Sequence, residues 1–278
     1  MGRPSRPELG LGQAVWLGLA HGPTELLPVS SSGHTTLIGW LAGWVLPELD
    51  VEFRKDFEVA LHAGTAAALL IGRRRELAGA AWLRDRRAGL VLALALGPPA
   101  LAGLAFESRI ERLGTPGRIA GGLVAGSLAL GLADVCGATD RRTADARPLD
   151  GLLLGLAQSA ALVPGISRNG ATLSVGRARG FGRDAADELS GDCGLAVIAG
   201  AVVLRAVRPR RPPAGRSRIV AGAAAAFVST FGSRRLLERR DRPVSLVACA
   251  AYRIGLAGVV GLRLGQIRRA GAAVADGA

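Results

Sequence analysis

Cysteine is scarce and scattered in this sequence. The 278 residues include only Cys136, Cys193 and Cys249, and no two of them form a CxxC pair. Metal sites built on cysteine need closely spaced pairs, so this spacing excludes such a site and gives a disulfide no support. We interpret the three thiols as small apolar side chains used in packing.

Amphipathic spacing, which marks the surface helices of soluble proteins, is also missing. The apolar residues come instead in blocks of about 15 to 20, near the length that a helix needs to cross a bilayer. A soluble protein of this size could bury one or two such helices, whereas this sequence holds about six. It therefore predicts an all-α polytopic membrane protein, with residues 1–278 forming a single integral membrane domain. The blocks include FEVALHAGTAAALLIG, GLVLALALGPPALAGLAF, IAGGLVAGSLALGLADV and IVAGAAAAFVSTFG.

Acidic residues are too few to balance the basic ones. Lys and Arg number 35 against 22 Asp and Glu, for a net charge of +13. Such an excess can indicate nucleic-acid binding. However, the arginines cluster between the apolar blocks, as in GRRRELAGAAWLRDRR, where loops beside membrane spans carry them. We expect no nucleic-acid partner. Basic loops fall on both sides of the expected spans, so charge does not decide the orientation.

The sequence repeats itself at a distance of about 137 residues, as its polar segments show. LGLAH at 17–21 returns as LGLAQ at 154–158, and SSSGHT at 30–35 meets SRNGAT at 167–172. For this reason we expect the N-terminal segment, which imitates a cleavable signal peptide, to be kept. The alternative is chance similarity between two regions rich in Gly and Ala.

Each half of the repeat has the same predicted order, a polar-interrupted apolar hairpin followed by three spans. Because three is odd, the second half must enter from the opposite face, which is typical of inverted repeats. We predict about six transmembrane helices plus two re-entrant helical hairpins, in halves of about 11–135 and 150–264. The hairpins are expected at about 11–46 and 150–180, and the spans at about 57–72, 88–106, 119–135, 193–207, 218–232 and 245–264.

The interruptions of the two hairpins have the chemistry of an anion site. In PVSSSGHT, any of Ser30 to Ser32 can cap a helix that begins near Gly33, and a helix N-terminus offers free amides to an anion. PGISRNGAT has the same design plus Arg168, whose planar fork suits phosphate oxygens. Two such turns that face each other predict a diphosphate site. The structural alternatives are plain helix capping for the serines and interfacial snorkelling for Arg168.

Ionisable residues within the apolar regions are further candidates. Glu25 and His21 lie four apart on one helix face, and a carboxylate at membrane depth by default signals function. The alternative for Glu25 is a structural salt bridge, with Arg168 as partner. His34 is either functional or an ordinary residue of a capped helix. Two weaker candidates are the Glu58 and His62 pair, which shares a helix face, and Asp134, which we interpret as a polar boundary residue.

These residues carry a resemblance to a known family. HGPTELLPVSSSGH and LVPGISRNGAT resemble the two signature motifs of the undecaprenyl-diphosphate phosphatases, also called bacitracin-resistance proteins, and FEVALHAGT and AAYRIGLAGVVG look like further landmarks. The resemblance implies a hydrolase that converts undecaprenyl diphosphate to the monophosphate carrier of cell-wall synthesis. It also implies the bacterial inner membrane, with the active site facing outside. The implied partners are the polyprenyl diphosphate lipid and the bilayer, and a homodimer is a further expectation.

The resemblance also implies roles for individual residues. Glu25 matches an acid thought to assist metal binding or proton handling, Ser31 is a nucleophile candidate, His34 is a base or nucleophile candidate, and Arg168 binds phosphate. The remaining substrate-binding candidates are Ser30, Ser32, Gly33, Ser167, Asn169, Gly170 and Thr172. The family is described as needing a divalent cation, Mg or Ca, for which the ligand candidates are Glu25 and His21.

Three departures from the family pattern bear on activity. His21 stands where the family usually has Glu or Gln, and imidazole is a poor ligand for Mg²⁺ or Ca²⁺. Asn169 replaces a serine, and Glu188 and Asp192 interrupt a segment that is apolar in the family, which should weaken its insertion. These departures favour a diverged member with altered activity. The competing hypotheses are a non-hydrolytic polyprenyl-phosphate transporter or flippase and an inactive structural homologue.

Overall fold

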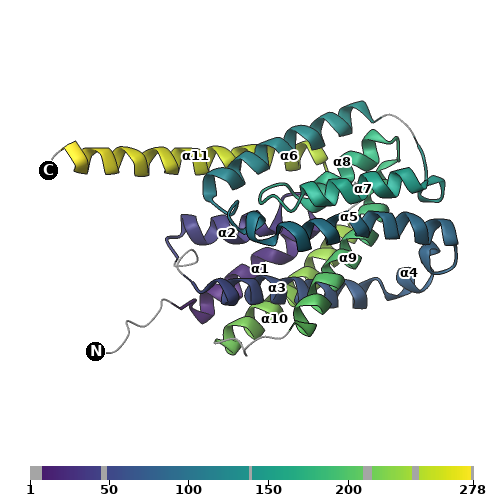
Figure 1. Ribbon diagram of the computed structural model, residues 1–278, viewed down its shortest axis with the longest axis horizontal. Coiled ribbons are helices and arrows are strands. Elements are labelled where there is room, and N and C mark those ends of the chain that lie inside the picture. The colour runs from purple at the N-terminus through teal and green to yellow at the C-terminus, as the bar shows by residue number, and fades with distance from the viewer. Residues whose placement is uncertain (1–7, 45–48, 138–139, 209–214, 240–243, 277–278) are drawn as a thin grey trace.

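The protein is all-helical in the computed structural model, which describes residues 8–44, 49–137, 140–208, 215–239 and 244–276. A helical hairpin of α1 and α2 comes first and three long helices follow it; the hairpin of α7 and α8 then begins the same order again (Figure 1). The all-α prediction is confirmed. The elements of the first set are α1 (Leu11–Leu26), α2 (Ser31–Leu41), α3 (Val51–Gly72), the short α4 (Arg74–Ala78), α5 (Arg86–Glu111) and α6 (Pro116–Cys136). Those of the second are α7 (Pro148–Ala160), α8 (Arg168–Ala178), α9 (Arg183–Val207), α10 (Arg216–Glu238) and α11 (Leu246–Asp276).

Each long helix extends beyond the span predicted for it. The predicted bounds followed apolar residues, whereas the helices continue through charged turns at their ends. At the start of α3, for example, the Asp50 side chain accepts hydrogen bonds from the amides of Glu52 and Phe53, so the helix begins before the apolar block. The division of the chain into two repeat halves stays a prediction, which the repeated order of elements supports.

The long helices make this a membrane protein. Among the described residues, four of these helices have segments that are long and apolar enough to cross a bilayer, at 86–106 in α5, 116–135 in α6, 183–207 in α9 and 246–272 in α11. Large apolar side chains on them face outward, including Leu101, Leu132 and Leu262, which are 66–73% exposed. The count of six spans stays a prediction for α3 and α10, whose charged end turns shorten their apolar parts.

The two sets of helices are interlocked. The first helix of each hairpin packs against the middle long helix of the other set, α1 on α10 and α7 on α5, while α6 packs on α11 (Figure 1). Glycines allow the close approach. A Cβ added at Gly18 would lie 2.3 Å from the Gly222 carbonyl of α10, and one added at Gly155 would lie 2.5 Å from the Leu94 carbonyl of α5. Small residues thus bring both hairpins into the centre of the bundle.

The cysteines behave as packing residues where their side chains are described. Cys193 and Cys249 are buried in one hydrophobic core cluster and are free thiols. The packing interpretation is confirmed for these two, and the side chain of Cys136 lies outside the described residues.

Candidate active site

The turns of the two hairpins meet inside the bundle. The buried guanidinium of Arg253, from α11, donates from Nη1 to the Pro28 carbonyl of the first turn (3.2 Å) and from Nη2 to the Gly165 carbonyl of the second (3.1 Å). Asn169 Nδ2 donates to the Leu26 carbonyl at the end of α1 (3.0 Å). The predicted convergence of two segments far apart in the chain is therefore confirmed.

The first turn holds its serines in an unusual way. Helix α2 begins at Ser31, two residues before the expected Gly33, and its N-cap Ser30 has a left-handed backbone with φ 77°. The Ser30 hydroxyl makes no cap hydrogen bond, so the predicted side-chain capping is wrong here. Instead Ser31 Oγ donates to Glu25 Oε2. The strained turn thus directs a hydroxyl toward the carboxylate and leaves the first amides of α2 unbonded within the helix.

The second turn is capped in the ordinary way. Ser167 is the N-cap of α8 in an extended conformation, and its Oγ accepts a hydrogen bond from the Gly170 amide (3.1 Å). Gly165 has φ 95°, and a Cβ there would lie 2.2 Å from the Ile119 carbonyl of α6. Only glycine therefore fits this position. The turn is packed tightly, and it presents Arg168 as the first residue of α8.

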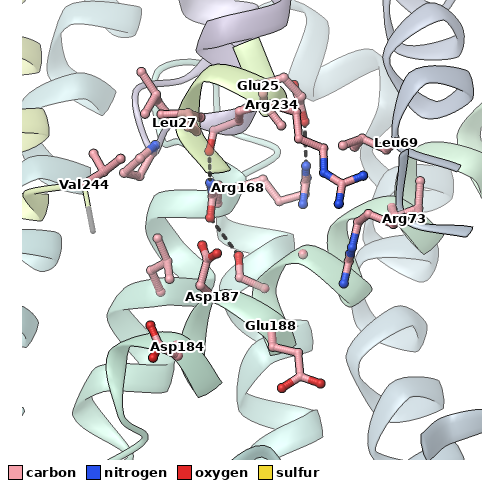
Figure 2. Close-up of a pocket in the computed structure, with 18 of the residues that line it drawn as sticks. Glu25, Leu27, Leu69, Arg73, Arg168, Asp184, Asp187, Glu188, Arg234 and Val244 are labelled. Carbon is pink, nitrogen blue, oxygen red and sulfur yellow. Dashed lines mark hydrogen bonds and ion pairs between the residues drawn. The ribbon is translucent and has the colours of Figure 1, made fainter. Parts of the chain in front are cut away.

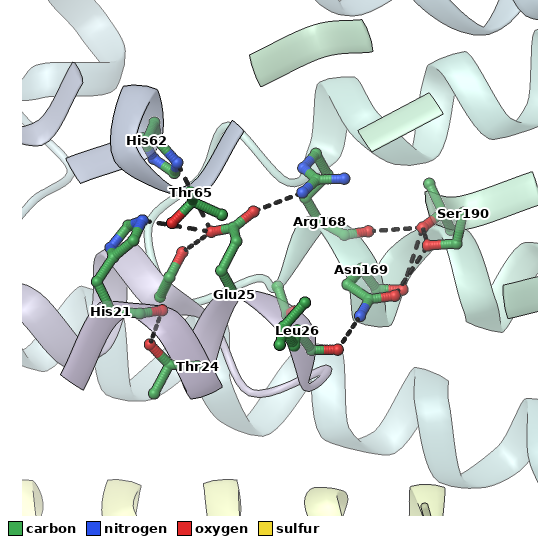
Figure 3. Close-up of polar contacts among 12 residues, drawn as sticks. His21, Thr24, Glu25, Leu26, His62, Thr65, Arg168, Asn169 and Ser190 are labelled. Carbon is green, nitrogen blue, oxygen red and sulfur yellow. Dashed lines mark hydrogen bonds and ion pairs between the residues drawn. The ribbon is translucent and has the colours of Figure 1, made fainter. Parts of the chain in front are cut away.

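Glu25 is the centre of the polar contacts (Figure 3). Its Oε1 lies 2.5 Å from Arg168 Nη2, and its Oε2 lies 3.8 Å from His21 Nε2 and 3.7 Å from His62 Nδ1. The salt bridge that we considered as the structural alternative is thus present. A buried carboxylate needs such a partner, because an unpaired charge in a low-dielectric interior is costly. The same guanidinium can bind a phosphate in exchange for Glu25.

Two cavities meet at this ion pair. A small cavity of about 170 Å³ is lined by both turns, with Ser30, Ser31, Ser32, Ser167 and His62 among its residues. A larger cavity of about 670 Å³ lies beyond the pair, with Asp184, Asp187 and Glu188 at its far end (Figure 2). Glu25, Arg168, Asn169 and Ile198 line both cavities. The small cavity therefore gathers the hydroxyls, the carboxylate and the guanidinium that the sequence singled out.

Comparison with known proteins shows the family of this chain. A family model described as bacitracin resistance protein BacA matches residues 14–259. The chain belongs to this family. An undecaprenyl-diphosphatase of Geobacter sulfurreducens is 36% identical over 89% of this chain and 96% of its own length. Relatives with the same name from Pelobacter propionicus and Thermomicrobium roseum are each 34% identical, over 91% and 89% of this chain and 96% of their own lengths.

Both turns of this BacA-family chain lie within the matched residues, but His34 does not join the others. Its Nδ1 is 2.7 Å from the Ser30 carbonyl, so that nitrogen carries the proton, and its Nε2 accepts from the Tyr252 hydroxyl at 2.8 Å. The two rings are stacked, with centroids 5.5 Å apart. His34 is absent from the residues that line the two described cavities. The structure thus holds the His34 ring against Tyr252 of α11.

Arg253, which joins the two turns, is a residue that sequence reasoning missed. Its side chain is fully buried, and a Cβ at Gly126 of α6 would lie 2.3 Å from its Nη2, so a glycine makes room for it. Gly170 also packs against it, since a Cβ there would lie 3.0 Å from Nη1. The signal was present in the sequence. Glu25 was singled out because an ionisable residue at membrane depth by default signals function. The same rule applies to the arginine in the apolar block VSLVACAAYRIGLAGVVGL.

The α9 segment that departs from the family pattern supports the site. Ser190 Oγ bonds both Asn169 Oδ1 (2.8 Å) and Thr172 Oγ1 (2.5 Å). A Cβ at Gly194 would lie 1.8 Å from Arg168 Nη1, so this glycine leaves the space that the guanidinium occupies. The acids have partners as well: Asp192 pairs with Arg73 at 2.8 Å, and Glu188 accepts from the Thr143 hydroxyl. Pairing offsets the expected cost of these acids, and α9 is still apolar enough to span.

Of the two weaker candidates, the Glu58 and His62 pair and Asp134, only the first has a residue that contacts Glu25. His62 turns toward Glu25 rather than serving only as a partner of Glu58 on α3. Asp134, at the end of α6, pairs with Arg183 at 2.5 Å, which agrees with a polar boundary residue. Around Glu25, one carboxylate and two imidazoles come together. Mg²⁺ and Ca²⁺ prefer oxygen ligands, so this donor set does not fit the cation that the resemblance implies.

Proposed function

We propose that this protein is a membrane phosphohydrolase that removes the terminal phosphate of undecaprenyl diphosphate. Its family and the name shared by its relatives support the reaction. The observation that carries the proposal is the meeting of Ser31, Glu25 and Arg168, from two hairpins, at one small cavity. Because the relatives compared above all bear a hydrolase's name, the transporter hypothesis gains no support.

Two helix N-termini and one guanidinium are suited to hold the diphosphate. The first amides of α2 and α8 have no partners within their helices, and the positive ends of both helix dipoles favour an anion. Arg168 adds a planar fork that matches phosphoryl oxygens. Ser30, Ser32, Gly33, Ser167, Gly170 and Thr172 belong to these two helix ends. In the proposal Gly33, Ser167, Gly170 and Thr172 shape the turns. The serine hydroxyls of the first turn face the substrate.

Ser31 is our choice of nucleophile because its hydroxyl already donates to a carboxylate. Its Oγ attacks the terminal phosphorus while Glu25 takes the hydroxyl proton. The bond from that phosphorus to the bridging oxygen breaks, and the polyprenyl monophosphate leaves. Water then displaces the phosphate from Ser31, Glu25 returns the proton to Oγ, and both protons of the water leave with inorganic phosphate. Arg168 stabilises the charge on the phosphoryl oxygens throughout.

Several finer expectations belong to the same proposal. We place the protein in the bacterial inner membrane with the small cavity accessible from the outer face, as the family resemblance implies. We also keep the expectations of a homodimer and of no nucleic-acid partner. A cysteine placed at exposed Arg268 on α11 tests the orientation. Its reaction with a membrane-impermeant thiol reagent is compared between intact cells and inverted vesicles.

Phosphate release from undecaprenyl diphosphate by the detergent-solubilised protein tests the reaction. Arg168→Ala and Glu25→Ala should each lower the rate by about 10³-fold or more. The first variant removes the positive charge that binds the phosphate, and the second removes the base. Arg268→Ala is the matched control, because this arginine is exposed on α11 and far along the chain from the site. Near-normal turnover by both site variants would refute the assignment.

A further inference from the structure

Three side chains of α1 and α3 point toward one another beside the serine turn. His21 and Glu25 project from α1, and His62 projects from α3 to meet them (Figure 3). One ligand atom from each lies within 4.8 Å of the other two, and the two imidazole rings are edge to face with centroids 4.6 Å apart. The cluster borders the small cavity, which Glu25 and His62 both line.

Three of the four ring nitrogens of this cluster lack hydrogen-bond partners. Within the described part of the chain, no hydrogen bond reaches either nitrogen of His21, which is 2% exposed, or Nδ1 of His62. The distances from His21 Nε2 and His62 Nδ1 to Glu25 Oε2, 3.8 Å and 3.7 Å, are too long for one. A buried polar group without a partner costs free energy, and a neutral imidazole has one donor and one acceptor to satisfy. The edge-to-face contact of the rings explains their packing but satisfies none of the three nitrogens.

The corresponding position of the second hairpin is different. Gln158 ends LGLAQ as His21 ends LGLAH, and its Nε2 donates to the Ala95 carbonyl of α5 at 2.8 Å. A polar side chain at this helix position can therefore be bonded to the neighbouring helix. At His21 the helix packing leaves the nitrogens to face Glu25 and His62 instead.

Two imidazoles and one carboxylate form a donor set with a known preference among metal ions. Such a set is typical of zinc and of other divalent transition metals, whereas Mg²⁺ and Ca²⁺ are bound by oxygen. Ligand atoms around a tetrahedral ion at about 2.1 Å are about 3.4 Å apart. The separations here are 3.7 Å and 3.8 Å from Glu25 Oε2 to the histidines, and none exceeds 4.8 Å. Small side-chain rotations would close them.

We propose that His21, Glu25 and His62 bind one divalent transition-metal cation of the zinc type at the edge of the phosphate cavity. Three protein ligands leave a coordination position open, as in catalytic zinc sites. The open position is next to Ser31, so the bound ion can draw charge from a phosphoryl oxygen. This use of the ion rests on the proposed function, while the binding itself does not.

Binding of Co²⁺, a spectroscopic probe for zinc sites, tests the inference without any substrate. The full chain, purified through a tag free of histidine and stripped with chelator, should bind one Co²⁺ and show a ligand-field absorption band that Zn²⁺ removes. Calorimetry should show Mg²⁺ and Ca²⁺ binding about 100-fold more weakly or not at all. A native protein with no stoichiometric Co²⁺ band would overturn the proposal before any variant is made.

The chain offers a matched control, because it contains only three histidines. His21→Gln and His62→Gln should each weaken Co²⁺ binding about tenfold or more and remove the band. His34→Gln should leave both unchanged, since Tyr252 and the Ser30 carbonyl hold that ring elsewhere. His21→Glu should weaken Co²⁺ and strengthen Mg²⁺ or Ca²⁺ binding, because it replaces a nitrogen with oxygens. Equal loss in all three glutamine variants would contradict the site.

The two proposals fail in different ways. A protein that binds one Co²⁺ through His21 and His62 but releases no phosphate from undecaprenyl diphosphate would refute the proposed function and keep the metal site. A protein that hydrolyses the lipid fully in chelator and shows no Co²⁺ band would refute the metal site and keep the function.

Discussion

The two hairpin turns have the same place in the repeated order of helices, yet they hold their polar groups in different ways. In the first turn the cap residue Ser30 is left-handed and its hydroxyl caps nothing, while Ser31 donates to a carboxylate. In the second turn Ser167 caps α8 through an ordinary hydrogen bond and Arg168 follows. The first turn therefore combines a strained backbone with a hydroxyl bonded to a carboxylate, whereas the second is an ordinary capped turn followed by an arginine. This difference supports the division of labour in the mechanism that we propose, with the nucleophile on the first turn and the phosphate-binding charge on the second.

The largest test of this comparison is a matched pair of serine variants. Ser31→Ala should lower the rate of phosphate release by about 10³-fold or more, because it removes the proposed nucleophile. Ser167→Ala should keep most of the activity and lower the free energy of unfolding by about 1 kcal/mol, because it removes a helix cap. Phosphate release and thermal unfolding in detergent measure the two effects. If both variants lose activity equally, the turns are not specialised.

The second test removes the link between the turns. Arg253→Met should lower the free energy of unfolding by about 2 to 4 kcal/mol, because two carbonyls lose a charged donor in the interior. The turns should also separate, so phosphate release should fall while the lipid still binds at higher concentration. Arg263→Met, at an exposed position of the same helix, is the control. An Arg253 variant with native stability and KM would show that the turns hold together without this guanidinium.

The smallest effect concerns the strain of the first turn. Ser30→Gly should relieve the left-handed backbone and raise the stability by about 0.5 to 1 kcal/mol. Activity should fall modestly, because a glycine loosens the turn that directs Ser31 toward Glu25. Ser167→Gly, where the backbone is extended, should give no such gain. A loss of stability in Ser30→Gly would mean that the hydroxyl, and not the backbone, determines this position.

The sequence predicted most of the fold because the signals were long or repeated. The recurrence of LGLA and of the Ser-Gly turns located both hairpins, and the apolar blocks located the long helices. The charged ends of α3 and α10 were harder to predict, because the composition of a charged turn does not reveal that the helix continues through it. The capping role given to the serines of the first turn was wrong because φ of Ser30 depends on how the turn packs, whereas Ser167 of the second turn does cap its helix.

Only part of the site could be predicted, because some of its contacts depend on how the helices pack. Glu25, Ser31 and Arg168 stood out as polar groups at membrane depth, and the structure brings them together. His62 was paired with Glu58 on its own helix, because only the packing of α3 on its neighbours turns it toward Glu25. His34 was placed among the catalytic candidates, but its contact with Tyr252 depends on α11, more than 200 residues away in the chain. The repeat allowed the meeting of the two turns to be predicted, whereas the contacts that His62 and His34 make with other helices left no signal in the sequence.

Rapid-quench labelling tests the division of labour most directly. Undecaprenyl diphosphate that carries ³²P in its terminal phosphate is mixed with the detergent-solubilised protein. The reaction is quenched within milliseconds in SDS at neutral to mildly alkaline pH, where both phosphoserine and phosphohistidine survive, and the protein is digested for mapping. We expect the label on the peptide that contains Ser31 in the native protein and in Ser167→Ala, and none in Ser31→Ala. Label on His34, or full turnover by Ser31→Ala, would contradict the account.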